Sequence, residues 1–227
     1  MNTNFKNFLV ISGDRNSEDK IADYTGAFLP EALAFMKTHN IPITNHHRVN
    51  LSYSESSRRF SVYNFIKKKY NELGQIEGIA FFCYGLNKKI QLGIRISDLQ
   101  DFSYLIKEVM PKKSINFTFA LYCCSIGDEP GIGGDRGFAD CLRDEMCKAG
   151  ITEVTITAHS ESGHATKNSS KKKFDGMGSP VGGTGGLWIV APKSTLWTKW
   201  KKLIIKTDLR FRVPFMTIAE IHKELDS

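Results

Sequence analysis

The stretches Ile79-Ala-Phe-Phe-Cys-Tyr-Gly85 and Phe119-Ala-Leu-Tyr-Cys-Cys-Ser-Ile-Gly127 decide the fold, because each is a short apolar run that stops on chemically reactive residues. Apolar runs of this length, bounded by glycine, are typical of strands buried on both faces of a parallel sheet. In an open α/β sheet, functional sites collect at the carboxyl ends of the strands. The second stretch therefore places the Cys124 thiol where a substrate would bind, and Cys124 is the candidate nucleophile.

Strand and helix patterns alternate along the whole chain, which predicts an α/β fold. The expected strands cover about residues 8–12, 42–51, 79–83, 119–124, 154–158 and 186–191, and the expected helices about 18–37, 60–73, 98–110, 138–149, 196–204 and 217–225. Such alternation produces a mostly parallel central sheet with helices on both faces. We expect the 227 residues to form one domain. A long flexible loop is expected at about 160–186, where glycine and lysine replace apolar periodicity.

Charge and hydropathy narrow the class of partner. The net charge is +7, and lysines gather at 67–69, 171–173 and 199–202. Solvated lysine faces explain such runs, and no nucleic-acid-binding motif accompanies them, so nucleic acid is not an expected partner. No apolar segment approaches the roughly 20 residues of a membrane span, which predicts a soluble protein without membrane contact. A basic nucleic-acid-associated protein, whose binding would fall steeply with salt, remains an alternative.

The cysteines indicate a reducing location. The chain has five of them, at positions 83, 123, 124, 141 and 147. The odd number and the adjacent pair do not favour structural disulfides, and the N-terminus does not resemble a signal peptide, so we expect a cytoplasmic protein. His46-His47 and the cysteines lack the spacing of a metal site, and the glycine-rich segments lack the Gly-Lys-Ser/Thr of a phosphate loop. No metal and no cofactor are expected.

Cys124 could attack a substrate only as a thiolate, which needs a base, a cation or oriented backbone amides nearby. It precedes the glycine-rich segment 127–137, where backbone N–H groups can point at a developing oxyanion. Gly85 is a second candidate donor, because a residue without a side chain lets substrate approach closely. The alternative is an inert, buried cysteine that ends a core strand.

The order of the segments around these residues resembles the caspase-like cysteine peptidases, in particular the bacterial CHAT-type domains. The resemblance covers roughly residues 75–160 and rests on short motifs in the family's order: Cys83-Tyr84-Gly85, Ile90-Gln-Leu-Gly93, Ser97-Asp98-Leu99, Cys123-Cys124-Ser125-Ile126-Gly127, Gly137-Phe-Ala-Asp-Cys-Leu142 and Ala149-Gly150. It implies a caspase-like three-layer sandwich and an endopeptidase acting on a peptide or protein substrate. It also implies Cys124 as nucleophile, Gly85 at the oxyanion hole, and a bacterial or phage setting.

Tyr84 departs from the family, which has its histidine base at that position. A phenol keeps its proton at neutral pH and is a poor acceptor for the thiol proton. A replacement base is predicted from the next strand, which in the family lies beside the cysteine strand. That strand ends on His159, and adjacent strands lie about 5 Å apart. His164, in the following loop, is the second candidate, and Tyr84 would orient the substrate or line its pocket.

These observations predict a caspase-like cysteine hydrolase, most simply an endopeptidase, with Cys124 as nucleophile and a relocated or missing histidine base. Asp98 and Asp128 flank the predicted site, which favours a substrate with a basic side chain, and His164 would also contact substrate. The alternative is a catalytically degenerate caspase-like fold that binds a peptide, a protein or a small signal without turnover. Replacement of the family's histidine by Tyr84 is what this alternative expects.

Overall fold

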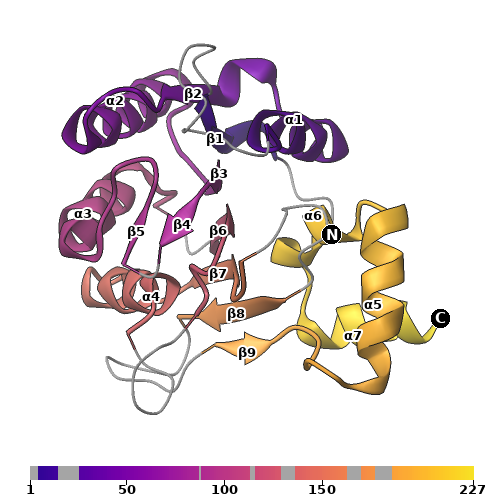
Figure 1. Cartoon of the computed structure of the whole chain (residues 1–227). Helices are drawn as coiled ribbons and strands as arrows, with labels where there is room; N and C mark the ends of the chain where they lie inside the picture. The colour runs from indigo at the N-terminus through magenta and orange to yellow at the C-terminus, as the bar shows by residue number, and fades with distance from the viewer. Residues whose placement is uncertain are drawn as a thin grey trace.

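The structure, a computed structural model, describes residues 5–14, 26–86, 88–112, 116–128, 136–162, 170–176 and 186–227. Its centre is a seven-stranded sheet in the order β2-β1-β3-β6-β7-β8-β9 (Figure 1). The strands are β1 (Phe8–Asp14), β2 (His46–Asn50), β3 (Gly78–Cys83), β6 (Phe117–Cys123), β7 (Val154–His159), β8 (Lys171–Asp175) and β9 (Leu187–Trp188). The first five in spatial order are parallel, whereas β8 pairs antiparallel with β7 and β9 pairs antiparallel with β8. The prediction of a mostly parallel α/β sheet is confirmed.

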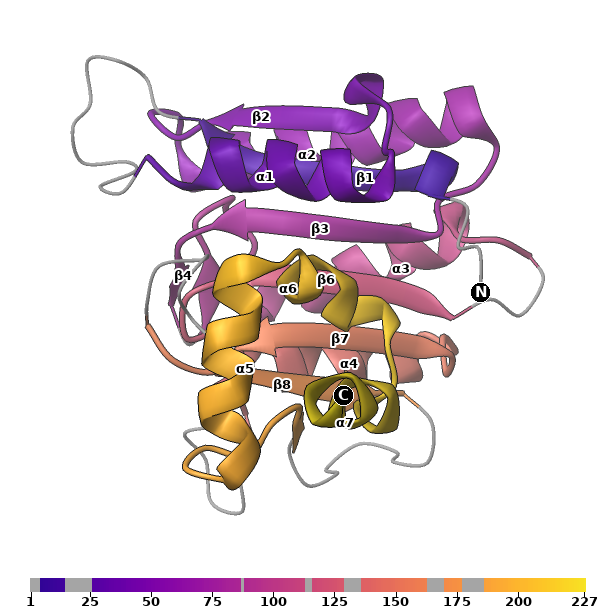
Figure 2. The same ribbon diagram turned by 90° about the vertical axis from the view of Figure 1, so that its right-hand side faces the viewer.

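Helices cover both faces of the sheet, so the molecule has three layers (Figures 1 and 2). One face carries α2 (Glu55–Leu73), α3 (Leu99–Val109) and α4 (Phe138–Lys148). The other carries α1 (Phe28–His39), α5 (Thr195–Lys206), α6 (Leu209–Arg212) and α7 (Ile218–Asp226). Four short 3-10 helices complete the helices of the described residues: η1 (Phe5–Asn7), η2 (Ile43–Asn45), η3 (Ile96–Asp98) and η4 (Val213–Phe215).

The central strands β3 and β6 are buried on both faces. Successive side chains of a strand point to opposite faces. Phe81 and Phe119 enter the core under α2, α3 and α4, whereas Phe82 and Tyr122 enter the core under α1. The rings of Phe82 and Tyr122 stack with their centroids 4.5 Å apart. The continuous apolar runs of the sequence follow from this two-sided burial.

The C-terminal helices close the second face. Helices α5 and α7 share a small core around Trp200, separate from the cores against the sheet. Phe211 of α6 contacts Tyr122, with the ring centroids 5.7 Å apart. Phe215 of η4 packs edge-on against Phe5 of η1, with the ring centroids 4.7 Å apart, so the first described residues contact the segment between α6 and α7.

One sequence-based expectation needs correction. Residues 171–175, expected within a flexible loop at 160–186, form β8, because Phe174 packs into the core against α4 and Lys171 is buried on the opposite face. Residues 163–169 and 177–185 of that expected loop lie outside the described residues. The segment after Gly85 forms a separate hairpin of β4 (Gly85–Leu86) and β5 (Lys89–Ile90). The first helix begins at Phe28, and the expected start at 18–25 lies outside the described residues.

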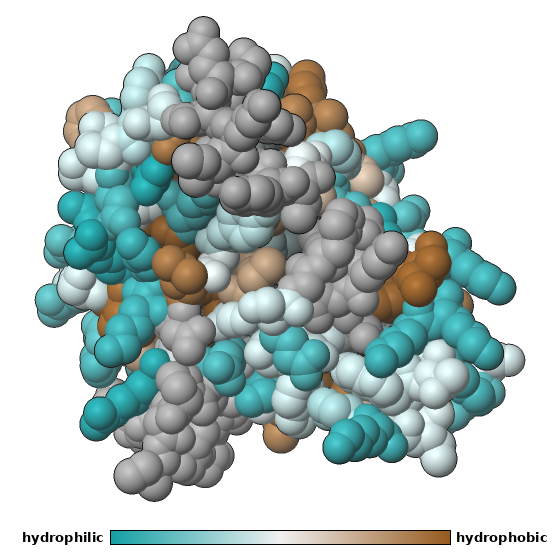
Figure 3. All heavy atoms as spheres, viewed as in Figure 1, coloured by the Kyte–Doolittle hydropathy of each residue, from teal (hydrophilic) through white to brown (hydrophobic). Residues whose placement is uncertain are grey.

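The exposed surface is mixed. Figure 3 shows hydrophobic residues on one face as small separate areas among hydrophilic ones. The large hydrophobic side chains that are exposed include Leu86, at 60%, and Ile205, at 63%. None of the helices in the described parts of the chain combines the length and apolar composition that a membrane crossing requires.

Replacing Phe119 by Ala is expected to lower the free energy of unfolding by about 3–5 kcal/mol, because the ring is fully buried in the core and its loss leaves a cavity. The matched control is Phe60→Ala on α2, whose ring is 67% exposed, with an expected change within about 0.5 kcal/mol. Urea unfolding followed by circular dichroism measures both. Equal effects of the two substitutions would contradict the central place of β6 in the core.

Candidate functional site

Tyr84 and Cys124 follow the paired ends of β3 and β6. Cys83 and Cys123 are the last partners in the register of these parallel strands. The next residue of each strand therefore leaves the sheet at the same edge, where the carboxyl ends of the parallel strands lie. Cys124 begins a turn and its side chain is half-buried. The structure thus brings together the two segments that the sequence singled out.

The turn after Cys124 is fixed by backbone hydrogen bonds to β7 and its following residues. Ser125 has a left-handed backbone conformation, with φ 53°, which bends the chain sharply away from β6. The Ser125 N–H donates to the Glu161 carbonyl at 3.3 Å, and the Gly127 N–H donates to the His159 carbonyl at 2.6 Å. These two N–H groups are therefore engaged within the fold.

Gly85 lies directly against the turn at residues 124–127 (the cysteine turn). A Cβ atom added at Gly85 would lie 2.2 Å from the Cys124 carbonyl oxygen and 2.2 Å from the side chain of Ile126. Real Cβ atoms do not approach other heavy atoms this closely, so the contact requires glycine. The contact also gives a structural reason for this glycine, beside the oxyanion role predicted for it.

Tyr84, at the position where the sequence resemblance predicts a histidine, is held in place by two hydrogen bonds of its backbone and by the packing of its ring. Its N–H donates to Oε1 of Gln91 at 3.2 Å, and its carbonyl accepts from the Gln91 N–H at 2.9 Å. The ring packs edge-on against Phe28 of α1, with the centroids 4.8 Å apart. The phenol therefore lies on the α1 side of the sheet.

His159 lies beside Tyr122, below the level of Cys124. Ala158 pairs with Leu121, so His159 is the neighbour of Tyr122, and their rings are 5.8 Å apart. The imidazole is 1% exposed, and its Nε2 atom has no hydrogen-bond partner. Burial, and then the Lys171 cation, lower the pKa of His159 well below its usual value. The base role of His159 stays a prediction, and the environment of the ring opposes its protonation.

A buried polar cluster that the sequence did not reveal surrounds His159. Lys171, paired with His159 across β7 and β8, is 2% exposed and lies over the Tyr122 ring. The Lys171 Nζ and the Tyr122 hydroxyl both donate to the Arg210 carbonyl at 3.0 Å. The Arg210 guanidinium lies 3.5 Å from Glu31. Burial, and then the Arg210 cation, lower the pKa of Lys171 to about 7.

Asp98, a predicted substrate ligand, is engaged in an ionic network that fixes the β4–β5 hairpin. Its carboxylate pairs with Arg59 at 2.6 Å and accepts from the Arg95 N–H at 2.9 Å. Glu55, the first residue of α2, accepts from Lys89 Nζ at 2.6 Å and from Arg95 Nε at 2.7 Å. The network ties the hairpin that carries Gly85 to the start of α2.

The other predicted substrate-binding residues are placed only in part. Asp128 is half-buried and its N–H donates to the Ser125 carbonyl at 3.4 Å, so it belongs to the cysteine turn. His164 lies outside the described residues. Within the described ranges, no three His, Cys, Asp or Glu side chains are arranged to hold a metal ion.

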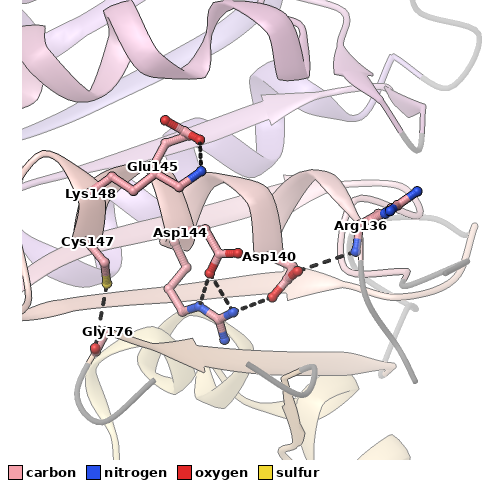
Figure 4. A network of polar contacts seen from close by, with 8 residues as sticks. Arg136, Asp140, Asp144, Glu145, Cys147, Lys148 and Gly176 are labelled. Atoms are coloured by element: carbon pink, nitrogen blue, oxygen red, sulfur yellow. Dashed lines mark hydrogen bonds and ion pairs between the residues drawn. The ribbon is translucent and has the colours of Figure 1, made fainter. Parts of the chain in front are cut away.

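A second network, absent from the sequence-based expectations, holds the helix that follows the glycine-rich segment (Figure 4). Arg143 of α4 is buried and donates to Asp140 at 2.6 Å and to Asp144 at 2.7 Å. Asp140 also accepts from the backbone N–H of Arg136 at 3.4 Å. A carboxylate in the first turn complements the helix dipole. The network therefore stabilises the start of α4 beside the cysteine turn.

Comparisons with models of protein families, with curated proteins and with solved structures found no match.

Lys171→Met is expected to remove part of the pH dependence of stability. A lysine with a pKa of about 7 when folded and near 10.4 when unfolded binds fewer protons in the folded state between these values. Stability contributed by this group therefore rises with pH from about 7 to 10, by roughly 3–5 kcal/mol in total. Urea unfolding at pH 7 and pH 9.5 should show a smaller rise in Lys171→Met than in the exposed control Lys201→Met. Equal rises in the two variants would show that the pKa of Lys171 is not lowered in the folded protein.

Gly85→Ala is expected to lower the free energy of unfolding by about 1–3 kcal/mol, because the new methyl group must displace the Cys124 carbonyl or Ile126. The control is Leu86→Ala in the same hairpin, where the side chain is 60% exposed. The same displacement should change the alkylation rate of Cys124, measured by peptide mass spectrometry, in Gly85→Ala and not in Leu86→Ala. An unchanged rate and stability in Gly85→Ala would show that the hairpin does not control the cysteine turn.

Proposed function

We propose that this protein is a caspase-like cysteine hydrolase that cleaves a peptide or protein substrate at the carboxyl edge of its sheet. The observation that carries the proposal is the close packing of Gly85 on the backbone of Cys124, at the paired ends of β3 and β6. Together with the order of the motifs in the sequence, this packing supports a thiol nucleophile next to the Gly85 backbone, at the edge where the parallel strands end.

In the proposed reaction the Cys124 thiolate attacks the carbonyl carbon of the scissile bond. The N–H groups of Gly85 and Cys124 would donate to the oxyanion of the tetrahedral intermediate. Collapse of the intermediate expels the amine, which takes up a proton, and leaves an acyl-enzyme. Water then attacks the acyl carbonyl, releases the acid and restores the thiol. The protein must supply a group that takes the thiol proton and returns one to the amine.

His159 is the candidate for that group among the described histidines. The other four each hydrogen-bond elsewhere: His39 to the Phe211 carbonyl, His46 to Ser12, His47 to Ser61 and His222 to the Ile189 carbonyl. The Nε2 atom of His159 is unpaired. To serve as base, the imidazole would have to leave its contact with Tyr122 and rise to the level of Cys124.

A second candidate function is a peptide- or protein-binding module without turnover. The specific observation in its favour is the packing of the Tyr84 ring against Phe28. Tyr84 stands where the family has its histidine, and a phenol does not readily accept a proton. The same edge of the sheet would then bind its partner without attack by Cys124.

Alkylation by iodoacetamide separates the two functions. In a hydrolase, Cys124 should react at pH 7 on the order of tenfold faster than Cys141 and Cys147, half-buried cysteines of α4 that serve as internal controls. Peptide mass spectrometry resolves each cysteine. A Cys124 that reacts no faster than the α4 cysteines would favour the binding module.

Incubation with a library of peptides tests turnover directly. The hydrolase predicts cleavage products that disappear in Cys124→Ala and fall strongly in His159→Gln, whose side chain keeps polar atoms but cannot act as a base. Loss of cleavage in Cys124→Ala with full activity in His159→Gln would keep the nucleophile and reject this base. Absence of cleavage by the wild type, with peptide binding retained in Cys124→Ala, would reject the hydrolase.

A further inference from the structure

Two buried thiols touch directly behind the candidate site. Cys83 and Cys123 are the last residues of β3 and β6 and are direct partners in the register. Both side chains point into the core under α2, α3 and α4, and both are fully buried. Their Sγ atoms are 3.4 Å apart.

The backbone geometry at this pair is compatible with a disulfide. Neighbouring strands lie about 4.7–4.9 Å apart, and Cα atoms joined by a disulfide are usually about 4.4–6.8 Å apart. The sulfur atoms need to approach by about 1.3 Å to reach the S–S bond length of about 2.05 Å. Rotation of the two side chains toward each other supplies such a movement without a change of register.

We propose that Cys83 and Cys123 form a reversible cross-strand disulfide and are an oxidation site of this protein. With a hydroperoxide as oxidant, one of the two cysteines loses its proton and attacks the peroxide oxygen as a thiolate, giving a sulfenic acid, and the proton goes to the alcohol or water that is released. Burial, and then the hydrogen bond with Cys83, raise the pKa of Cys123, so this first step is slow. The sulfur of the second cysteine then displaces the sulfenic hydroxyl group, which leaves as water with that cysteine's proton, and the S–S bond forms. A dithiol reductant restores both thiols by exchange.

The surroundings of the remaining cysteines favour this pairing over others. Cys124 is adjacent to Cys123 in the chain, and a ring closed between neighbouring residues strains the disulfide geometry. Cys141 and Cys147 lie on α4, where Cys147 donates to the Gly176 carbonyl at 3.6 Å. Among the described contacts, the thiol that Cys123 meets is that of Cys83.

The bond would join the two strands one residue before Tyr84 and Cys124. It would thereby lock together the strand ends on which the candidate site is built, while leaving Cys124 as a thiol. The inference rests on the contact between the two sulfur atoms and does not depend on the reaction proposed above.

Oxidation of the folded chain tests the inference. The protein is treated with hydrogen peroxide, which is small enough to reach a buried site. Free thiols are then blocked with iodoacetamide in denaturant, where buried thiols become accessible, and the chain is digested without reductant. Mass spectrometry should find the peptides of Cys83 and Cys123 joined, with the mass of two hydrogen atoms lost, and dithiothreitol should separate them. The α4 cysteines Cys141 and Cys147 should remain unlinked and serve as internal controls.

Two variants sharpen the result. Cys83→Ala should abolish the link, whereas Cys124→Ala should retain it, so failure of the hydrolase proposal leaves this test intact. The inference is overturned if Cys83 and Cys123 are recovered as blocked thiols or as sulfinic acids while Cys124 is oxidised. It is also overturned if Cys123 is found linked to Cys124 or to a second chain.

Discussion

Backbone hydrogen bonds between β3 and β6 hold the two central strands in register, and every feature of the candidate site depends on that register. Since Cys83 pairs with Cys123, the residues that follow each strand emerge together at one edge. A slip by one residue would turn every side chain of the moved strand to the opposite face. Phe119 would leave the core under α3, and Tyr122 would enter it. Burial of both faces makes such a slip costly and so fixes the site.

The two faces of the sheet handle buried charge differently. Under α4, the Arg143 guanidinium lies between two carboxylates, Asp140 and Asp144, which match its charge. On the opposite face, Lys171 meets a backbone carbonyl and the Tyr122 ring, which stabilise an ammonium group less than a carboxylate does. The environment around His159 is therefore one in which an added positive charge is costly, and this is the main physical obstacle to its predicted role.

Composition and periodicity predicted the parts of the structure that depend on single segments. The apolar runs around Phe81 and Phe119 identified strands buried on both faces, and their endings placed Cys124 at the carboxyl edge. The buried Lys171 could not be predicted, because a run of three lysines has the composition of a solvated segment and only the pairing of β8 with β7 turns Lys171 inward. The position of His159 relative to Cys124 could not be predicted either.

The position of His159 depends on the register between β6 and β7, which the composition of one strand does not encode. We expected His159 beside Cys124 on the premise that the strands end together, whereas β7 pairs so that His159 lies beside Tyr122. The catalytic roles of Cys124 and His159 stay predictions.

The contact between Phe5 and Phe215, together with the hydrogen bonds to the Arg210 carbonyl, has a consequence for biosynthesis. A chain is made from its N-terminus, so the side of Tyr122 that meets Phe211 and Arg210 stays uncovered until residues 209–215 have left the ribosome, and a nascent chain would need a chaperone there.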